Sequence, residues 1–227
     1  MKQSGINMVR TGIWTGWKSM MLDVGAPNEV ALRSLEAFVL TARKYDIPLI
    51  FTLFAFVPEQ WGGENPYLDP RSVNAQKEFV GAIALRFESV NDLFWDLINE
   101  PSFCNPKQLW TCRPNYDKFE GAAWGDWLKT RVKADDDSGK STQIQQMHRA
   151  TADEPASLPT PQDFSDLNIF DDHRPIKAVD YRLFAQEMFR LWIDQMTSAI
   201  RSNGNAHQFI TVGQDEGGTG DRPNPQF

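Results

Sequence analysis

The sequence predicts an α/β fold with a parallel sheet. Three observations support this: apolar runs typical of buried strands, apolar repeats of helical spacing between them, and loops rich in Trp, Glu, Asp and Gly after the strands. Helices that connect neighbouring strands imply right-handed crossovers. Such folds carry their chemistry at the carboxyl ends of the strands. These patterns leave open whether the sheet is open or closed into a barrel.

The first strand is expected over residues 6–14, an apolar and β-branched run that Gly16 follows. Residues 28–45 then have the apolar spacing of a helix, with Asn28 near its start. The second strand, 47–57, is a continuous apolar run of the kind buried on both faces of a sheet. In the helix expected over residues 28–45, the apolar face consists of Val30, Leu35, Phe38, Val39 and Ala42.

A second helix begins at residues 69–70, where Asp-Pro is a helix-start signal, and carries one apolar stripe as far as Phe87. The third strand is expected over residues 92–98. Asn99-Glu100-Pro101 stops this strand, because proline has no N–H to donate to a central ladder.

An irregular region, residues 102–174, follows the third strand and is interpreted as an insertion. It contains a helical piece near 119–132 and an acidic, polar stretch at 134–161. Residues 179–200 then predict a strong helix, and 209–213 predict a fourth strand.

The charge and the apolar runs argue against two classes of partner. The net charge is -7, with no dense basic cluster to follow a phosphate backbone. The longest strongly apolar run, 47–57, is far shorter than the roughly 20 residues that span a bilayer. Residues 1–10 lack the features of a signal peptide. We therefore expect neither nucleic acid nor a membrane as the partner.

The sequence also offers little for a metal or a cofactor. His148, His173 and His207 lie in separate segments without ligand spacing, so no metal site is expected. No glycine-rich phosphate loop or serine nucleophile elbow follows a strand, so no nucleotide cofactor is expected. Cys104 and Cys112 either close a small disulfide or remain two free thiols. Carboxylates are left as the candidate catalytic groups.

Glu100 is the strongest candidate carboxylate. It closes a strand between Asn99 and Pro101, at the mouth of the expected sheet. A carboxylic acid there can protonate a leaving oxygen, although a solvated glutamate at a strand end is an equal alternative. Strand alternation aims Asn99 and Glu100 at opposite faces, so both serve one site only if the pleat breaks at Pro101.

Three further charged residues have two interpretations each. Arg10, in the first strand, either orients a catalytic carboxylate or forms a structural ion pair with Asp96. Asp215 and Glu216 follow the fourth strand, where they either bind sugar hydroxyls or solvate a glycine-rich turn.

The chain has 8 tryptophans, of which Trp14, Trp17 and Trp61 fall in loops after strands. An indole in such a loop can stack on the C–H face of a sugar ring, and the alternative for each is a place in the core. The tryptophans expected in the core are Trp95, Trp124, Trp127 and Trp192.

These motifs resemble clan A of the glycoside hydrolases, the (β/α)₈-barrel superfamily that includes cellulases, mannanases and β-galactosidases. Residues 7–10, Asn-Met-Val-Arg, look like its second strand, and 99–101, Asn-Glu-Pro, like the end of its fourth. Residues 159–164 and 180–184 resemble the region between the fourth and fifth strands in family 5 and family 42 members.

The resemblance implies an incomplete (β/α)₈ TIM barrel, in which residues 1–227 form a partial catalytic domain. This domain would hold about strands two to five, with the insertion 102–174 after the fourth strand. Glu100 would be the acid/base, Asn99 the contact to the sugar 2-hydroxyl, and Arg10 the residue that positions the nucleophile.

Family members carry the nucleophilic glutamate on the seventh strand, which has no counterpart here. The nucleophile is therefore expected beyond Phe227, and the chain is interpreted as an interior fragment, inactive by itself. The implied activity is hydrolysis of O-glycosidic bonds in β-linked oligosaccharides or polysaccharides by a retaining, cofactor-free mechanism. Two alternatives remain: a non-catalytic carbohydrate-binding barrel, and an unrelated α/β-barrel enzyme in which Glu100 is a general base.

Overall fold

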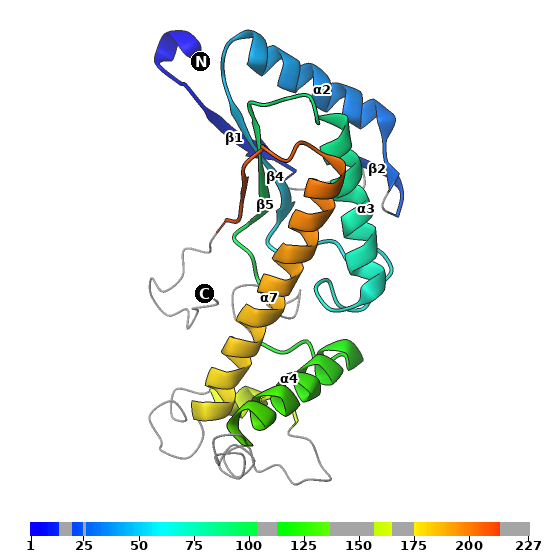
Figure 1. The fold of residues 1–227 in the computed structure, drawn as a ribbon, viewed down its shortest axis with the longest axis vertical. Coiled ribbons are helices and arrows are strands. Elements are labelled where there is room, and N and C mark those ends of the chain that lie inside the picture. The colour runs from blue at the N-terminus through cyan, green and yellow to red at the C-terminus, as the bar shows by residue number, and fades with distance from the viewer. Residues whose placement is uncertain (14–19, 25, 104–112, 137–156, 165–174, 214–227) are drawn as a thin grey trace. The chain divides into compact units, whose positions relative to one another are not determined.

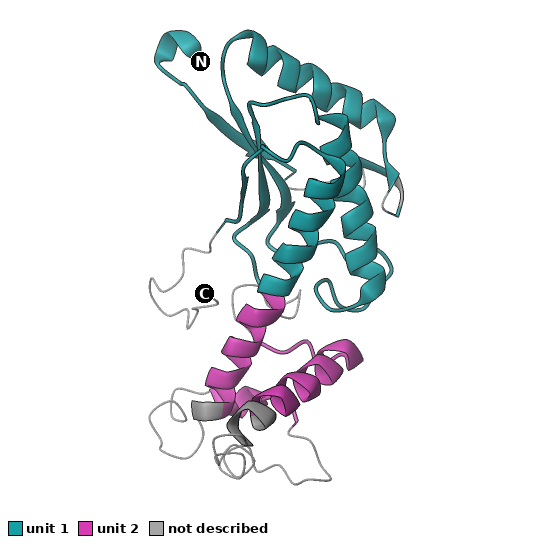
Figure 2. Cartoon of the chain, in the orientation of Figure 1, with its two compact units in different colours: residues 1–102, 190–216 teal, residues 103–189, 217–227 magenta. Residues whose placement is uncertain are grey.

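The structure is a computed structural model, and its residues form two compact units (Figure 2). Unit 1 is Met1–Ser102 with Arg190–Glu216, and unit 2 is Phe103–Phe189 with Gly217–Phe227. The expected insertion falls within unit 2, apart from its first residue. The structure describes residues 1–13, 20–24, 26–103, 113–136, 157–164 and 175–213.

Unit 1 is built on a four-stranded sheet in the order β1-β4-β5-β6, and every pair of neighbours is parallel (Figure 1). The register places Arg10 beside Ile50 and Thr52 beside Asp96. The predicted α/β fold with a parallel sheet is therefore confirmed. The strands are β1 (Val9–Gly12), β4 (Leu49–Ala55), β5 (Leu93–Asn99) and β6 (Ile210–Thr211).

The helices of unit 1 begin where their capping residues predict. The Asn28 side chain accepts a hydrogen bond from the N–H of Val30, and that of Asp69 accepts one from Arg71. Pro70 is the first residue of its helix, where its missing N–H costs nothing. In Figure 1 the helices are drawn on one side of the strands. They are α2 (Glu29–Lys44), α3 (Pro70–Arg86) and the second half of α7 (Pro175–Asn203).

Buried tryptophans with satisfied indole N–H groups organise the core of unit 1. Trp95 donates to the side-chain oxygen of Gln208 at 2.7 Å, and Trp192 donates to that of Gln76 at the same distance. Burying a polar indole is tolerated because each N–H has a partner. The four tryptophans expected in a core are all buried: Trp95, Trp124, Trp127 and Trp192.

Unit 2 packs an aromatic core between α4 (Lys118–Asp136) and the first half of α7. Trp124 stacks on Trp127 with ring centroids 5.4 Å apart, and both rings meet the edge of Phe184. Offset-stacked and edge-to-face pairs are the favoured aromatic geometries. A short 3₁₀ helix, η2 (Pro161–Phe164), adds the Phe164 ring against Tyr181.

Element boundaries differ from the expected ones where pairing or burial is lost. β1 begins at Val9 rather than at residue 6, because its partner strand follows Pro48, which cannot donate to a ladder. On α2 the expected face is wrong in part: Val30 and Phe38 are exposed, and Leu32 is buried with Val39 and Ala42. The hairpin β2 (Met21–Asp23) with β3 (Ala26–Pro27) and the 3₁₀ helix η1 (Lys2–Ser4) are not predicted by the sequence.

Candidate active site

The candidate site lies at the carboxyl edge of the sheet, where β4 and β5 end side by side. Asn99 is the last residue of β5 and pairs in register with Ala55, the last residue of β4. Glu100 and Phe56 follow directly. Parallel strands bring their carboxyl ends to one edge of the sheet, and the sequence predicts that Glu100 lies at this edge.

Both strands turn sharply at this edge. Glu100 has a φ of 45° and Phe56 a φ of 60°, which is the left-handed region that non-glycine residues rarely adopt. The Phe56 N–H donates to the Asn99 carbonyl at 2.8 Å, and the Phe56 carbonyl accepts from the Ser102 N–H at 2.7 Å. These bonds hold a conformation that costs on the order of 1 kcal/mol or more per residue.

The turn at Glu100 bears on whether Asn99 and Glu100 can serve one site. The sequence makes this depend on a break of the pleat at Pro101, and the backbone leaves the strand conformation one residue earlier, at Glu100. The alternation that would aim Asn99 and Glu100 at opposite faces therefore ends at Asn99. Glu100 as a whole residue is half-buried.

Arg10 reaches from β1 across β4 to a buried carboxylate on β5. Its Nε donates to Asp96 Oδ2 at 3.0 Å, and its Nη2 donates to the same oxygen. The Thr52 hydroxyl on β4 donates to this oxygen as well, at 2.7 Å. The Asp96 side chain is 1% exposed and that of Arg10 39%. The ion pair that the sequence offered as one interpretation of Arg10 is therefore present.

Arg10 also contacts a candidate site residue. Its Nη2 donates to Asn99 Oδ1 at 2.9 Å. One guanidinium thus joins the buried Asp96 to the amide at the end of β5. The structure brings Arg10 and Asn99 together, two of the residues that the sequence selected. Arg10 also links Asn99 to Asp96, which the sequence offered only as the partner of a structural ion pair.

Two glycines allow the outer strands to lie close to β4 and β5. A Cβ atom at Gly12 would overlap the backbone of Thr52, and one at Gly213 would lie 2.6 Å from the carbonyl oxygen of Ile98. The Gly213 N–H donates to that same oxygen at 2.9 Å. Glycine at these positions is required by close backbone approach rather than by backbone conformation.

Trp61 lies in the loop between β4 and α3, as expected. It has a φ of 41°, and its half-buried ring packs on Phe79 of α3 with centroids 5.5 Å apart. Part of the indole thus serves packing. The other sequence candidates and the two cysteines lie outside the described residues: Trp14, Trp17, Cys104, Cys112, Asp215 and Glu216.

Among the described residues, a pKa that is raised to near neutrality belongs to one that sequence reasoning missed. Burial raises the pKa of Glu120, in α4 of unit 2, to about 7. Its carboxyl group accepts from the N–H groups of Asn115 and Tyr116 and from the Tyr181 hydroxyl. The available signal was its place three residues after Asp117, which caps the same helix turn.

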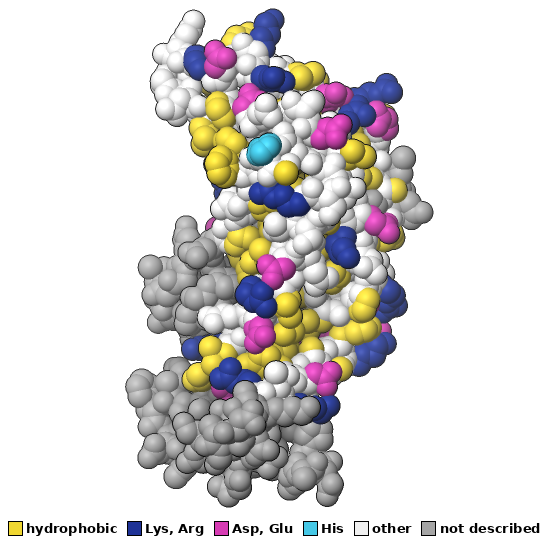
Figure 3. Space-filling model, viewed as in Figure 1, with side chains coloured by type: hydrophobic (Ala, Val, Ile, Leu, Met, Phe, Trp, Pro, Cys, Tyr) yellow, Lys and Arg dark blue, Asp and Glu magenta, His cyan; other side chains and the backbone are white. Residues whose placement is uncertain are grey.

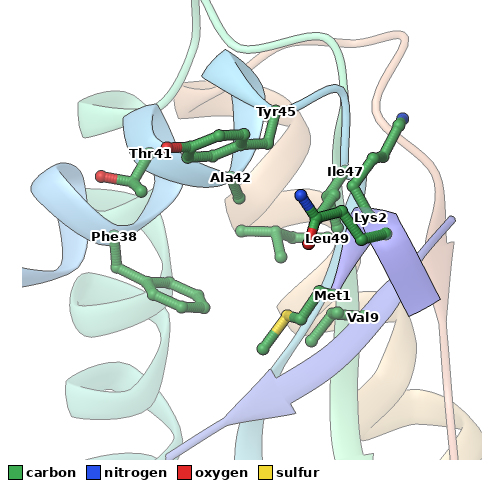
Figure 4. A pocket seen from close by; sticks show the side chains of 10 residues that line it. Met1, Lys2, Val9, Phe38, Thr41, Ala42, Tyr45, Ile47 and Leu49 are labelled. Atoms are coloured by element: carbon green, nitrogen blue, oxygen red, sulfur yellow. The ribbon is translucent and has the colours of Figure 1, made fainter. Parts of the chain in front are cut away.

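A pocket of about 510 Å³ lies elsewhere in unit 1. It is mostly apolar. Its lining includes Val9 at the amino end of β1, Leu49 at the amino end of β4, Phe38 of α2, and Tyr45, the C-cap of α2 (Figure 4). This is the edge of the sheet opposite to Glu100.

The described residues show no metal-binding cluster. No group of three or more His, Cys, Asp or Glu side chains among them is arranged to hold a metal ion. On the face drawn in Figure 3, basic and acidic side chains are interspersed. Among the described helices, none combines the length and apolar character that crossing a membrane requires.

The sequence matches no protein-family model and no curated protein. Solved structures, by contrast, match at low identity. The β-galactosidase from Bacillus circulans sp. alkalophilus gives a TM-score of 0.62 at 13% identity, over 93% of this chain and 32% of that one. A subfamily 5-4 endoglucanase from an uncultured bacterium gives 0.47 at 12% identity, over 93% and 43%. An exo-β-agarase gives 0.48 at 13% identity, over 78% and 25%.

The chain spans about a third of the length of that β-galactosidase. At this identity the likeness concerns the fold alone. The chain itself has the parallel strand order β1-β4-β5-β6 with helices between the strands, and the likeness to the β-galactosidase agrees with this order. The fold is therefore that of the incomplete (β/α)₈ barrel that the resemblance implies.

Proposed function

We propose that this chain carries the acid/base half of a glycoside hydrolase site that cleaves O-glycosidic bonds in β-linked glycans. The observation that supports this most directly is the strand end Asn99-Glu100, where the turned backbone follows an amide hydrogen-bonded to Arg10. The barrel-like fold and its likeness to a β-galactosidase add support.

In this proposal Glu100 protonates the leaving oxygen while a second carboxylate attacks the anomeric carbon. Glu100 then deprotonates the water that releases the sugar, so configuration is retained. The half-buried position of Glu100 suits a group that exchanges its proton with substrate and water. The second carboxylate is expected on another strand. The mechanism uses two carboxyl groups and water and needs no cofactor.

The other proposed contacts recognise the sugar. Asn99 contacts the 2-hydroxyl, and Arg10 supports this edge of the site. Trp61 and Trp14 offer ring faces, and Glu216 a carboxylate for sugar hydroxyls. Since the Trp61 ring already packs on Phe79, it can offer only the part of its surface that stays exposed.

Binding by the 227-residue chain tests the proposal directly. NMR titration with cellotriose and lactose, both β-linked, should shift the signals of Asn99 and its neighbours, while the α-linked maltotriose should not. Asn99→Ala should weaken binding roughly threefold to tenfold, because about one hydrogen bond is lost. Glu100→Gln should leave ground-state binding nearly unchanged. If no β-linked glycan binds at this edge, the proposal is wrong.

Hydrolysis separates the enzyme from a non-catalytic carbohydrate-binding protein. In a longer form of the protein that hydrolyses glycosides, Glu100→Gln should slow natural glycosides by orders of magnitude. Aryl glycosides with very good leaving groups should suffer less at the glycosylation step, since they need less protonation. Equal, small losses on both substrates would remove Glu100 from the acid role and favour the binding protein.

A further inference from the structure

Asp96 uses only one of its two carboxylate oxygens. Oδ2 accepts three hydrogen bonds, two from Arg10 and one from Thr52. Oδ1 is buried, and within the described part of the chain no hydrogen-bond donor reaches it. All three hydrogen bonds to this buried carboxylate therefore meet at the single oxygen Oδ2, between β1 and β5. Charge-assisted hydrogen bonds of this kind are among the strongest in proteins.

This point fixes the plane of the Arg10 guanidinium. Nε and Nη2 both donate to Asp96 Oδ2, and a guanidinium is a rigid, planar fork. Because Nη2 also donates to Asn99 Oδ1 at 2.9 Å, its direction towards Asn99 is set by the bonds to Asp96. With 39% of the Arg10 side chain exposed, water would otherwise compete for the same N–H groups.

The guanidinium in turn fixes the polarity of Asn99. Arg10 has donors only, so the Asn99 atom that faces it must be the carbonyl oxygen. The Nδ2 group, which has two N–H donors, is left for other partners. An amide without this constraint can rotate and present its oxygen instead.

We propose that Asp96 is a positioning residue. Acting through Arg10, it locks the Asn99 side chain so that Asn99 presents an N–H donor, and never its oxygen, to a ligand oxygen at the end of β5. The identity of that ligand as a sugar hydroxyl rests on the proposed function. The locking of Asn99 does not, since it is a property of the chain alone.

NMR of the ¹⁵N-labelled chain without any glycan tests the locking. In Asp96→Asn, the Arg10 Nε–H should exchange with solvent about tenfold faster or more, as expected when a charged hydrogen bond is lost. The chemical shifts of the two Asn99 Nδ2 protons should move towards those of a solvent-exposed asparagine whose side chain rotates freely. The matched control is Asp92→Asn, which removes the carboxylate paired with Arg43 just before β5 and should leave the Asn99 signals unchanged.

A second variant and a double mutant complete the test. Arg10→Lys keeps a charge beside Asp96 but loses the fork, and it should release Asn99 as Asp96→Asn does, even if the latter does not fold. In an Arg10→Ala background, Asp96→Asn should have no further effect on Asn99, because it acts only through Arg10. Asn99 signals that are the same in the wild type, Asp96→Asn and Arg10→Lys would overturn the proposal.

Glycan binding gives a separate outcome. Asp96→Asn should weaken cellotriose binding about as much as Asn99→Ala, and the two changes together should weaken it no more than one alone. If Asn99 is released in the NMR test but no variant changes glycan binding, the positioning role holds and the proposed function fails. If β-linked glycans bind at this edge but the Asn99 signals do not change in Asp96→Asn or Arg10→Lys, the proposed function holds and the positioning role fails.

Discussion

Glu120 holds three hydrogen bonds at a position where its side chain is almost fully buried. One carboxylate oxygen accepts from the N–H groups of Asn115 and Tyr116, and the other accepts from the Tyr181 hydroxyl at 2.6 Å. The bonds from the backbone favour the charged form, but the loss of hydration outweighs them and raises the pKa of Glu120 to about 7.

The raised pKa predicts that unit 2 becomes less stable as the pH rises. Between about 4.5, the ordinary pKa, and about 7, the folded state binds a proton that the unfolded state has lost. The contribution of the Glu120 proton to stability is therefore fully present below pH 4.5 and is lost progressively as the pH rises to about 7. Glu120→Gln mimics the protonated form, since its oxygen can accept both backbone bonds and its amide can donate to Tyr181.

Melting temperatures of the wild type and Glu120→Gln at pH 4.5 to 8 measure this effect. The two should agree at pH 4.5, and the variant should melt at the higher temperature at pH 7.5. A wild type that gains stability relative to the variant as the pH rises would contradict the burial argument.

At the site, the sequence could select residues but not their links. Asn99, Glu100 and Arg10 were selectable because each is a polar residue on or directly after an apolar strand. The left-handed backbone at Glu100 was not, since local pattern gives no signal for a positive φ at a non-glycine residue. The bond from Arg10 to Asn99 depends on strand register across β4, which only the assembled sheet defines.

At the scale of elements, capping residues determine helix starts more closely than apolar patterns determine strand ends. Asn28 and Asp69 mark the starts of α2 and α3 because a side-chain acceptor satisfies an N–H of the first turn. Strand ends depend instead on the partner. β6 pairs at only Ile210 and Thr211, although the apolar run around it is longer.

Asp69 should contribute more to stability than an ordinary helix cap. It is fully buried and accepts from the N–H groups of Glu64 and Arg71 and from the Arg71 side chain. Asp69→Ala should lower the free energy of unfolding by about 2 kcal/mol, through the lost cap and the part-buried N–H groups left without this acceptor. Asn28→Ala, which removes the side-chain acceptor of the Val30 N–H in an exposed turn, should cost about 1 kcal/mol.

Urea unfolding of the two variants at pH 7 checks this order. The hydrogen bonds from Arg71 lower the pKa of Asp69 to about 2, so its charged form is stabilised by folding. That contribution is present above pH 3.8 and is lost as the pH falls towards 2. The difference between the wild type and Asp69→Ala should therefore shrink in acid, whereas that for Asn28→Ala should not. Equal costs at pH 7 would contradict the special role of Asp69.

At the scale of the whole molecule, the order of strands and helices was predictable and the division into units was not. Alternating strands and helices imply the parallel order β1-β4-β5-β6, because short connections place successive strands side by side. The single helix α7, by contrast, supplies residues to both units. Its apolar positions predict a helix but do not indicate which partner each part of it contacts.

The same scale decides whether the 227-residue chain can catalyse glycoside hydrolysis. Its described sheet has four strands, and β1 and β6 each pair with one described neighbour. The proposed mechanism needs a second carboxylate about 5 Å from Glu100 for retention, or about 6.5–9.5 Å away for inversion. In the four-stranded sheet, the described residues that directly follow β1, β4 and β6 carry no carboxylate, and the resemblance places the nucleophile on a later strand. We therefore predict no useful turnover by this chain alone.

The assay is turnover of a panel of aryl β-glycosides by the purified chain, beside Glu100→Gln and Glu216→Gln. Glu216 is one of the two carboxylate candidates that follow the fourth strand, and it is the glutamate among them, so it tests the prediction from within the chain. Background rates in all three proteins are the expected result. Robust turnover that Glu216→Gln and Glu100→Gln both abolish would instead make these two residues the catalytic pair, because neither carboxylate can act without the other.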